Sequence, residues 1–238
     1  MNNLIGIFDS GVGGFSVLEK LLQVLPDENY LYYSDNKNNP YGEKSDEELF
    51  SIVSEVVDYL KKQGCKLIVI ACNTATTKCI KKIKEFYSDL IFVGTVPAIK
   101  VACDKEFKNT LVMATPATIE SERCEELVRD NKRNDQNIYL VSCNGLANAI
   151  ELGKKDLVDK ILKGIFDEYR DKNIDSIVLG CTHYPFVKNE IKEEMPNATL
   201  LDGSMGVAKE VKRQLEINNL VNNSDEKGKV YIVNSNEL

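Results

Sequence analysis

Short apolar runs, rich in β-branched and aromatic residues, alternate along the chain with longer segments whose apolar residues recur at helical spacing. A nearly continuous apolar run is typical of a strand buried on both faces, as in a parallel sheet covered by helices. The alternation therefore predicts the α/β fold class with mostly parallel sheets. The predicted strands span residues 4–8, 30–34, 67–71, 91–94, 111–114, 138–141, 177–180, 199–201 and 230–233.

Two of the intervening segments carry a clear apolar stripe of helical period. The first stripe follows Ser45 and Glu48, whose spacing is that of a capping box and predicts where the helix begins. The two stripes consist of Leu49, Ile52, Val53, Val56, Val57 and Leu60, and of Leu157, Val158, Ile161, Leu162, Ile165, Phe166 and Tyr169.

The chain also resembles itself at a nearly constant offset. Cys181 follows Cys72 by 109 positions, and the flanking segments match. Such self-similarity predicts two similar α/β halves, with the last strand returning to the first half. We therefore expect a discontinuous first domain, residues 1–96 with 204–238, and a second domain of residues 97–203. The matched segments are 67–74 with 176–183, 5–10 with 111–116, and 92–95 with 200–203.

Composition and charge narrow the classes of function. The apolar fraction of 43% is too high for a disordered chain. The net charge of −7 argues against a protein that binds nucleic acid or anionic membranes. No apolar run approaches the roughly 18 residues of a spanning helix, and the first residues lack the pattern of a signal peptide. The sequence predicts a cytoplasmic protein.

The seven cysteines do not form a disulfide pattern, because their number is odd and their spacing irregular. The chain has no Cys-x-x-Cys pair, and His183 is its only histidine, so we expect no zinc site and no other metal site.

Polar residues follow several of the predicted strands. In open α/β sheets, ligands bind at the carboxyl ends of the strands, so these polar residues indicate a binding site. Each copy of the repeat places a cysteine, Cys72 or Cys181, at a strand-to-helix turn, where the helix dipole favours a thiolate. Polar residues follow both cysteines, whereas a core strand would continue apolar. We therefore interpret both as catalytic and the other five as inert. The strand-end segments are Asp9-Ser10, Cys72-Asn73-Thr74, residues 115–118, and Cys181-Thr182-His183.

The turn Gly11-Val-Gly13-Gly14-Phe-Ser16 nearly matches the dinucleotide fingerprint GxGxxG. Ser16 replaces the third glycine, and the Asp9 carboxylate would repel a pyrophosphate. The glycines more readily serve a tight turn or the close approach of a small polar ligand. Asp9 itself is open to two interpretations, a site residue or the N-cap of the following helix.

With these motifs assembled, the chain resembles the glutamate racemase family, whose members need no cofactor and supply D-glutamate for peptidoglycan. The motifs cover nearly the whole chain in the family's order. They are Ile5-Gly-Ile-Phe-Asp9-Ser10-Gly-Val-Gly-Gly, Asp35 with Pro40-Tyr41-Gly42, Ala71-Cys72-Asn73-Thr74-Ala-Thr76, Val96-Pro-Ala98, Ala114-Thr115-Pro-Ala-Thr118 and Leu179-Gly-Cys181-Thr182-His183-Tyr-Pro185.

The resemblance implies two facing α/β domains related by a pseudo-twofold axis, with the active site in the cleft between them. It implies that Cys72 acts on D-glutamate and Cys181 on L-glutamate, assisted by Asp9 and His183. It further implies no cofactor, glutamate as the small-molecule partner, and a homodimer. The substrate-binding residues that it implies are Asp9, Ser10, Pro40, Tyr41, Gly42, Asn73, Thr74, Thr118, Glu151, Thr182 and His183.

Three alternatives remain at this point. The chain could be an aspartate or other amino-acid racemase of the same superfamily, which rates on aspartate and glutamate would distinguish. It could be an amino-acid sensor, which binds without exchanging the Cα proton. It could also be a thiol redox regulator, which predicts a disulfide between Cys72 and Cys181.

Overall fold

The computed structural model describes residues 3–224 and 226–238 and divides into two compact units. Unit 1 comprises Met1–Thr95 and Ser204–Leu238, and unit 2 comprises Val96–Gly203. The first boundary therefore lies between Thr95 and Val96, one residue before the predicted position. Each unit has its own sheet and its own core, and the two are described separately below.

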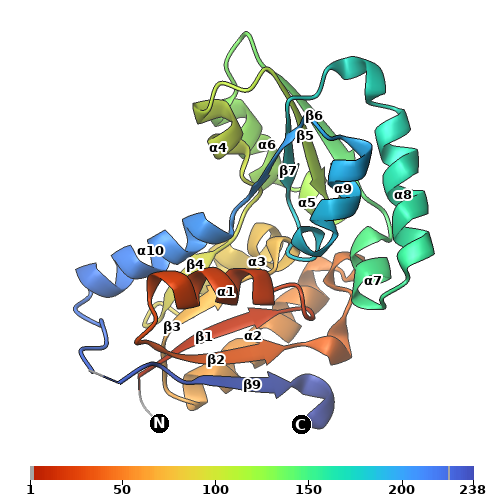
Figure 1. Cartoon of the computed structure of the whole chain (residues 1–238). Coiled ribbons are helices and arrows are strands. Elements are labelled where there is room, and N and C mark those ends of the chain that lie inside the picture. Colours follow the sequence, from red (N-terminus) through yellow and green to blue (C-terminus); the bar gives the residue numbers. More distant parts are fainter. Residues whose placement is uncertain (1–2, 225) are drawn as a thin grey trace. The chain divides into compact units, whose positions relative to one another are not determined.

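Unit 1 is built on a five-stranded parallel sheet with the order β4-β3-β1-β2-β9 (Figure 1). The strand β9, close to the end of the chain, pairs with β2 and forms one edge. The strands are β1 (Leu4–Asp9), β2 (Asn29–Ser34), β3 (Cys65–Ile70), β4 (Ile91–Gly94) and β9 (Val230–Asn234).

Helices cover both faces of this sheet, because alternate strand residues point to opposite faces. Ile5 and Ile7 pack with α1 (Phe15–Val24) and α10 (Ser204–Ile217), whereas Phe8 packs on the other side with α2 (Asp46–Lys62) and α3 (Asn73–Phe86). The predicted start of α2 is confirmed, since the Ser45 side chain accepts a hydrogen bond from the Glu48 backbone N–H.

Unit 2 has a four-stranded parallel sheet with the order β6-β5-β7-β8. This order repeats β2-β1-β3-β4 of unit 1 strand for strand, so the prediction of two similar α/β halves is confirmed. The strands are β5 (Asn109–Ala114), β6 (Asn137–Ser142), β7 (Ser176–Leu179) and β8 (Thr199–Asp202).

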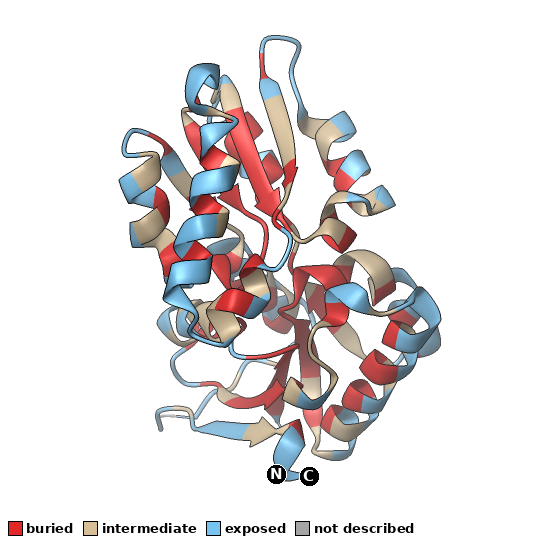
Figure 2. Ribbon diagram, turned by 90° about the vertical axis from the view of Figure 1, so that its right-hand side faces the viewer, coloured by how far each residue is buried: buried red, intermediate tan, exposed pale blue. Residues whose placement is uncertain are grey.

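The helices of unit 2 also pack on both sheet faces, and the inner strands β5 and β7 are largely buried (Figure 2). The stripe predicted around residues 157–169 lies in α8 up to Phe166, where Val158, Leu162 and Phe166 are buried, whereas Tyr169 lies two residues beyond the helix. Leu157, predicted to share this stripe, lies in the first turn of α8 and is 42% exposed. The helices are α4 (Ile99–Asp104), α5 (Pro116–Ile119), α6 (Glu122–Asn131), α7 (Leu146–Glu151), α8 (Lys155–Asp167) and α9 (Lys188–Glu194).

Five 3₁₀ turns complete the described structure: η1 (Asn36–Asn38), η2 (Tyr41–Glu43), η3 (Arg170–Lys172), η4 (Tyr184–Val187) and η5 (Ser235–Glu237).

All nine predicted strands are confirmed, with ends displaced by at most two residues. Ala71 and Gly180, predicted as strand ends, lie one residue beyond β3 and β7. Each still donates a backbone hydrogen bond to the neighbouring strand, Ala71 to Phe8 of β1 at 2.9 Å and Gly180 to Met113 of β5 at 2.7 Å.

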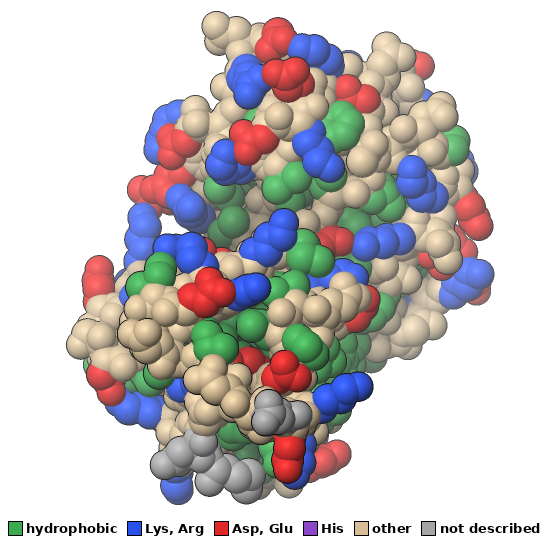
Figure 3. All heavy atoms as spheres, turned by 60° about the vertical axis from the view of Figure 1, so that its left-hand side comes forward, with side chains coloured by type: hydrophobic (Ala, Val, Ile, Leu, Met, Phe, Trp, Pro, Cys, Tyr) green, Lys and Arg blue, Asp and Glu red, His purple; other side chains and the backbone are tan. Residues whose placement is uncertain are grey.

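The molecular surface mixes basic and acidic side chains on the face shown in Figure 3. None of the helices in the described ranges is long and apolar enough to cross a membrane.

Candidate active-site residues at the strand ends

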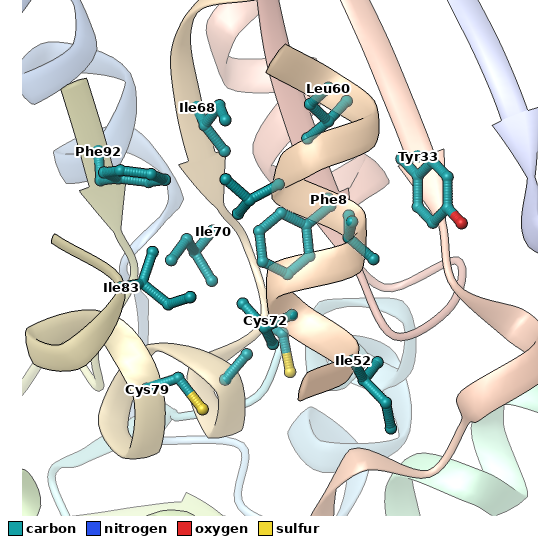
Figure 4. Close-up of a cluster of buried hydrophobic side chains, with 14 of the residues drawn as sticks. Phe8, Tyr33, Ile52, Leu60, Ile68, Ile70, Cys72, Cys79, Ile83 and Phe92 are labelled. Atoms are coloured by element: carbon teal, nitrogen blue, oxygen red, sulfur yellow. The ribbon is translucent and has the colours of Figure 1, made fainter. Parts of the chain in front are cut away.

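Cys72 is the N-cap residue of α3 and lies two residues beyond β3. Its side chain is 6% exposed and lies at the edge of the apolar cluster that also contains Phe8, Ile70 and Cys79 (Figure 4). The Sγ atom is 4.0 Å from the hydroxyl of Ser10, the residue directly after the neighbouring strand β1. Because Cys72 begins a 14-residue helix, the helix dipole favours a negative charge at this position.

The five cysteines other than Cys72 and Cys181 all have a raised pKa. All seven are free, so the chain contains no disulfide. Burial raises the pKa of Cys65 and of Cys143 to about 12, and that of Cys79 and of Cys124 to about 11. Burial also raises the pKa of Cys103. These five thiols therefore stay protonated at neutral pH, as expected of inert core residues.

Asp9 is fully buried and holds the glycine turn that follows β1. Its Oδ2 accepts hydrogen bonds from the backbone N–H groups of Gly11 at 3.3 Å and Gly14 at 3.1 Å. Gly14 leaves no room for a side chain, since an added Cβ would lie 2.8 Å from Asp9 Cβ and 2.7 Å from the Tyr32 hydroxyl. The interpretation of Asp9 as the N-cap of the following helix is therefore wrong: the N-cap of α1 is Gly14, without a side-chain cap hydrogen bond, and the Asp9 carboxylate holds the turn before that helix.

A second buried carboxylate, Asp35, follows β2 and organises the next loop. The Tyr41 hydroxyl donates to Asp35 Oδ2 at 2.7 Å, and Asn38 Nδ2 donates to both carboxylate oxygens. Burial, followed by the Asp35 charge, raises the pKa of Tyr41 well above its usual value, so the ring stays neutral. The Tyr41 hydroxyl is therefore already hydrogen-bonded to Asp35 within the protein.

Asp35 belongs to one of the motifs shared with the family, but the sequence analysis did not predict it as a site residue. Its position in the sequence could have indicated this role, because a carboxylate directly after a buried strand needs hydrogen-bond partners.

Pro40 precedes η2 and follows a cis peptide bond. Gly42 is exposed, and no atom would lie within 4 Å of a Cβ added there.

Asn73 and Thr74 occupy the first turn of α3 and are 6% and 3% exposed. The Asn73 Oδ1 atom is one of two buried side-chain oxygens in the described residues that lack a hydrogen-bond partner. Such an atom is costly unless a ligand or water satisfies it. The other is the hydroxyl of Tyr184, which neighbours the Cys143 thiol in the core of unit 2.

In unit 2, Cys181, His183 and Glu151 form a connected chain of polar groups. Cys181 lies two residues beyond β7, the equivalent of β3 in unit 1. Its Sγ is 3.7 Å from His183 Nδ1, and His183 Nε2 is 2.6 Å from Glu151 Oε2, at the end of α7. The side chains of His183 and Glu151 are only 4% and 8% exposed, so the pair is shielded from water.

The remaining predicted residues of unit 2 lie at strand ends as well. Thr118 is fully buried in α5, and both its backbone N–H and its hydroxyl interact with the Thr115 hydroxyl. Thr182 lies between Cys181 and His183 and is 6% exposed. The structure therefore gathers Asp9, Ser10, Cys72, Asn73 and Thr74 in unit 1 at the carboxyl ends of β1 and β3. The corresponding group in unit 2 is Thr118, Glu151, Cys181, Thr182 and His183.

A separate cavity of unit 1, of about 260 Å³, contains none of these residues. Its lining includes Asn29, Asn222 and Lys229, at the opposite end of the sheet. In residues 3–224 and 226–238, no group of three or more His, Cys, Asp or Glu side chains could hold a metal ion.

The chain matches known proteins over nearly its full length. The family model described as Asp/Glu/hydantoin racemase matches residues 5–209. A glutamate racemase of Clostridium perfringens is 43% identical over 99% of this chain and 92% of its own length. One of Clostridium botulinum is also 43% identical, over 98% of this chain and 91% of its own.

Solved structures give the same result. A glutamate racemase isoform from Bacillus anthracis is 29% identical with a TM-score of 0.86, covering 98% of this chain and 88% of that one. A glutamate racemase from Francisella tularensis, solved in complex with D-glutamate, is 29% identical over the same shares with a TM-score of 0.85. The chain belongs to the aspartate/glutamate/hydantoin racemase family.

Proposed function

We propose that this protein interconverts L-glutamate and D-glutamate without a cofactor, using Cys72 and Cys181 as the two acid/base groups. The observation that carries the proposal is the equivalent position of the two thiols. Each follows the strand beside the central strand of its sheet, in two units of the same strand order. The relatives named glutamate racemase at 43% identity support glutamate as the substrate.

Racemisation removes the Cα proton from one face of glutamate and returns a proton to the other. One thiolate acts as the base while the other thiol acts as the acid, and the two exchange roles in the reverse direction. We assign Cys72 to D-glutamate and Cys181 to L-glutamate. The five remaining thiols are unsuited to this task, because burial keeps them protonated.

The carbanion formed at Cα needs preorganised hydrogen-bond donors, since no electron sink is available. We propose that the backbone N–H groups at the start of α3 bind the α-carboxylate. The buried, unpartnered Asn73 Oδ1 is suited to accept from the substrate ammonium. Ser10, Thr74, Thr118 and Thr182 complete the polar contacts, and the backbone of Pro40-Tyr41-Gly42 holds the side-chain carboxylate.

Asp9 and His183 assist the thiols in different ways. His183 lies within reach of the Cys181 thiol and can relay or stabilise its proton. Asp9 acts through the glycine turn that it holds beside Ser10. We assign Glu151 to the orientation of His183, because its carboxylate is already bound to the imidazole.

We further propose that the enzyme is a cytoplasmic homodimer and supplies D-glutamate for peptidoglycan. The protein carries a net charge of −7, so attraction of the anionic substrate depends on local donors and not on the overall field.

The test is to incubate purified protein with L-glutamate in D₂O, with no added cofactor. We expect loss of optical activity together with deuterium at Cα, unaffected by EDTA or by carbonyl reagents that trap pyridoxal phosphate. Aspartate should react far more slowly. Activity lost to EDTA and restored by a metal would contradict the mechanism, and binding without Cα exchange would favour an amino-acid sensor.

A further inference from the structure

The chain places a turn near its end against a loop of the proposed substrate site. The 3₁₀ turn η5 packs on η1 within unit 1. The hydroxyl of Ser235 in η5 accepts a hydrogen bond of 2.9 Å from the backbone N–H of Lys37 in η1. The two residues are 198 positions apart, and Ser235 is only 7% exposed.

Strand pairing brings Ser235 to this place. The strand β9 runs parallel to β2 in register from Tyr30 opposite Val230 to Ser34 opposite Asn234. Because both strands end at the same edge, the residue after β9 lies beside the loop that follows β2. Asn234 Oδ1 accepts from the Asn236 backbone N–H at 3.0 Å and fixes the turn that presents Ser235.

Lys37 belongs to the first turn of η1, where a backbone N–H has no partner within the helix. Ser235 supplies that partner from outside the loop. Within the loop, Asp35 binds Asn38 and Tyr41 but does not bind Lys37. The segment from Lys37 to Gly42 is thus held at two points, by Asp35 from inside and by Ser235 from the end of the chain.

We propose that Ser235 is a positioning residue for substrate binding: it fixes the 36–42 segment so that the backbone of Tyr41 and Gly42 meets the side-chain carboxylate of glutamate. This inference rests on the proposed racemase function. Because Ser235 acts on the binding loop and not on the thiols, its loss raises KM and leaves kcat nearly unchanged.

The experiment compares Ser235→Ala with Ser235→Thr, which keeps the hydroxyl, and with Ser224→Ala as the matched control. Ser224 lies on the same terminal segment, but its hydroxyl accepts a hydrogen bond from the nearby Glu226 backbone N–H and not from the 36–42 segment. Steady-state racemisation of both enantiomers is measured for each variant. We expect KM for glutamate to rise about 2- to 10-fold in Ser235→Ala, the range of one net hydrogen bond. Ser235→Thr and Ser224→Ala should keep the original KM.

A lower kcat with unchanged KM in Ser235→Ala would overturn the inference, because that result indicates loss of folded enzyme and not of loop position. An unchanged KM would overturn it as well. Hydrogen exchange in the unsubstituted protein tests the anchor even if Ser235→Ala does not fold. Protection of the Lys37 amide supports the inference, and exchange at the rate of exposed amides contradicts it. If the unsubstituted protein fails to racemise glutamate, the proposed function fails instead.

Discussion

His183 Nε2 lies 2.6 Å from Glu151 Oε2, and this contact leaves His183 Nδ1 facing the Cys181 thiol. A histidine so placed has its ring orientation and its proton position fixed by the carboxylate. If Cys181 is the acid/base group that we propose, Glu151 supports its proton transfer through His183.

Glu151→Gln should lower kcat/KM about 10- to 100-fold, the range for loss of a hydrogen bond to a charged group. The value of kcat/KM must fall equally for both directions of racemisation, because the two enantiomers have equal free energy. The direction-specific effect is measured with glutamate analogues that carry a leaving group beside Cα, since elimination needs proton abstraction alone. Elimination from the L analogue, through Cys181, should slow, and that from the D analogue should not. The control is Glu125→Gln on the exposed face of α6. Equal slowing with both analogues would contradict the assignment.

Cys72→Ser and Cys181→Ser should each reduce racemisation at least about 100-fold, because each removes one partner of the acid/base pair. A serine hydroxyl is too weak an acid to supply the base. Cys72→Ser should still eliminate from the L analogue through Cys181, and Cys181→Ser from the D analogue through Cys72.

Matched controls are Cys79→Ala, in the same cluster as Cys72, and Cys124→Ala in the core of unit 2. These substitutions should alter the free energy of unfolding only. If both active-site variants favoured the same enantiomer, one of the two thiols would have to be structural.

Gly42→Pro should raise KM for glutamate at least about 10-fold, because it removes a backbone N–H proposed to bind the side-chain carboxylate. Gly42→Ala is the control, since it keeps the N–H and its Cβ has open space. Thermal unfolding of both variants separates binding from stability. An unchanged KM in Gly42→Pro would mean that Pro40-Tyr41-Gly42 is only a turn.

The raised pKa values of the buried thiols predict that the folded protein loses stability at alkaline pH. The Cys65 thiol has a pKa of about 12 in the folded protein against an ordinary value of 9.0, so the folded state keeps the proton that the unfolded chain loses. Its contribution to stability is complete below about pH 9 and is lost as pH rises from there toward 12. Between pH 8 and pH 10 this one thiol should lower the free energy of unfolding by about 1 kcal/mol.

Urea unfolding at the two pH values, in reducing buffer, measures this loss. Cys65→Ala should show a smaller pH difference, whatever its stability at pH 8. An equal pH difference in the variant and the original protein would show that Cys65 does not contribute.

The strands could be predicted from the sequence because each strand is a continuous apolar run. Cys72 and Cys181 could be proposed as the catalytic pair because polar residues follow each thiol, where a core strand would continue apolar. The repeat added information that no single motif held, since it linked Cys72 to Cys181. Leu157 was misplaced because an apolar stripe does not reveal which of its members falls in an exposed first turn.

The supporting contacts could not be predicted in the same way. The bond between His183 and Glu151 joins residues 32 positions apart on different elements, and that between Lys37 and Ser235 spans 198 positions. Both depend on strand order and register, which local patterns do not encode. The role of Asp35 depends on the path of the loop back to Tyr41.

The division of unit 1 into two stretches of chain imposes an order on protein synthesis. When residues 1–95 have left the ribosome, the sheet still lacks β9 along β2, and the sheet face lined by Ile5 and Ile7 lacks α10. Unit 2 is one continuous stretch and can complete its sheet before unit 1 can. The nascent chain therefore carries an open strand edge and an apolar face that only α1 covers for more than a hundred further residues, Val96–Gly203. A ribosome-stalled chain ending near residue 203 should bind chaperones that recognise apolar surface, whereas one extended past β9 should be released from them.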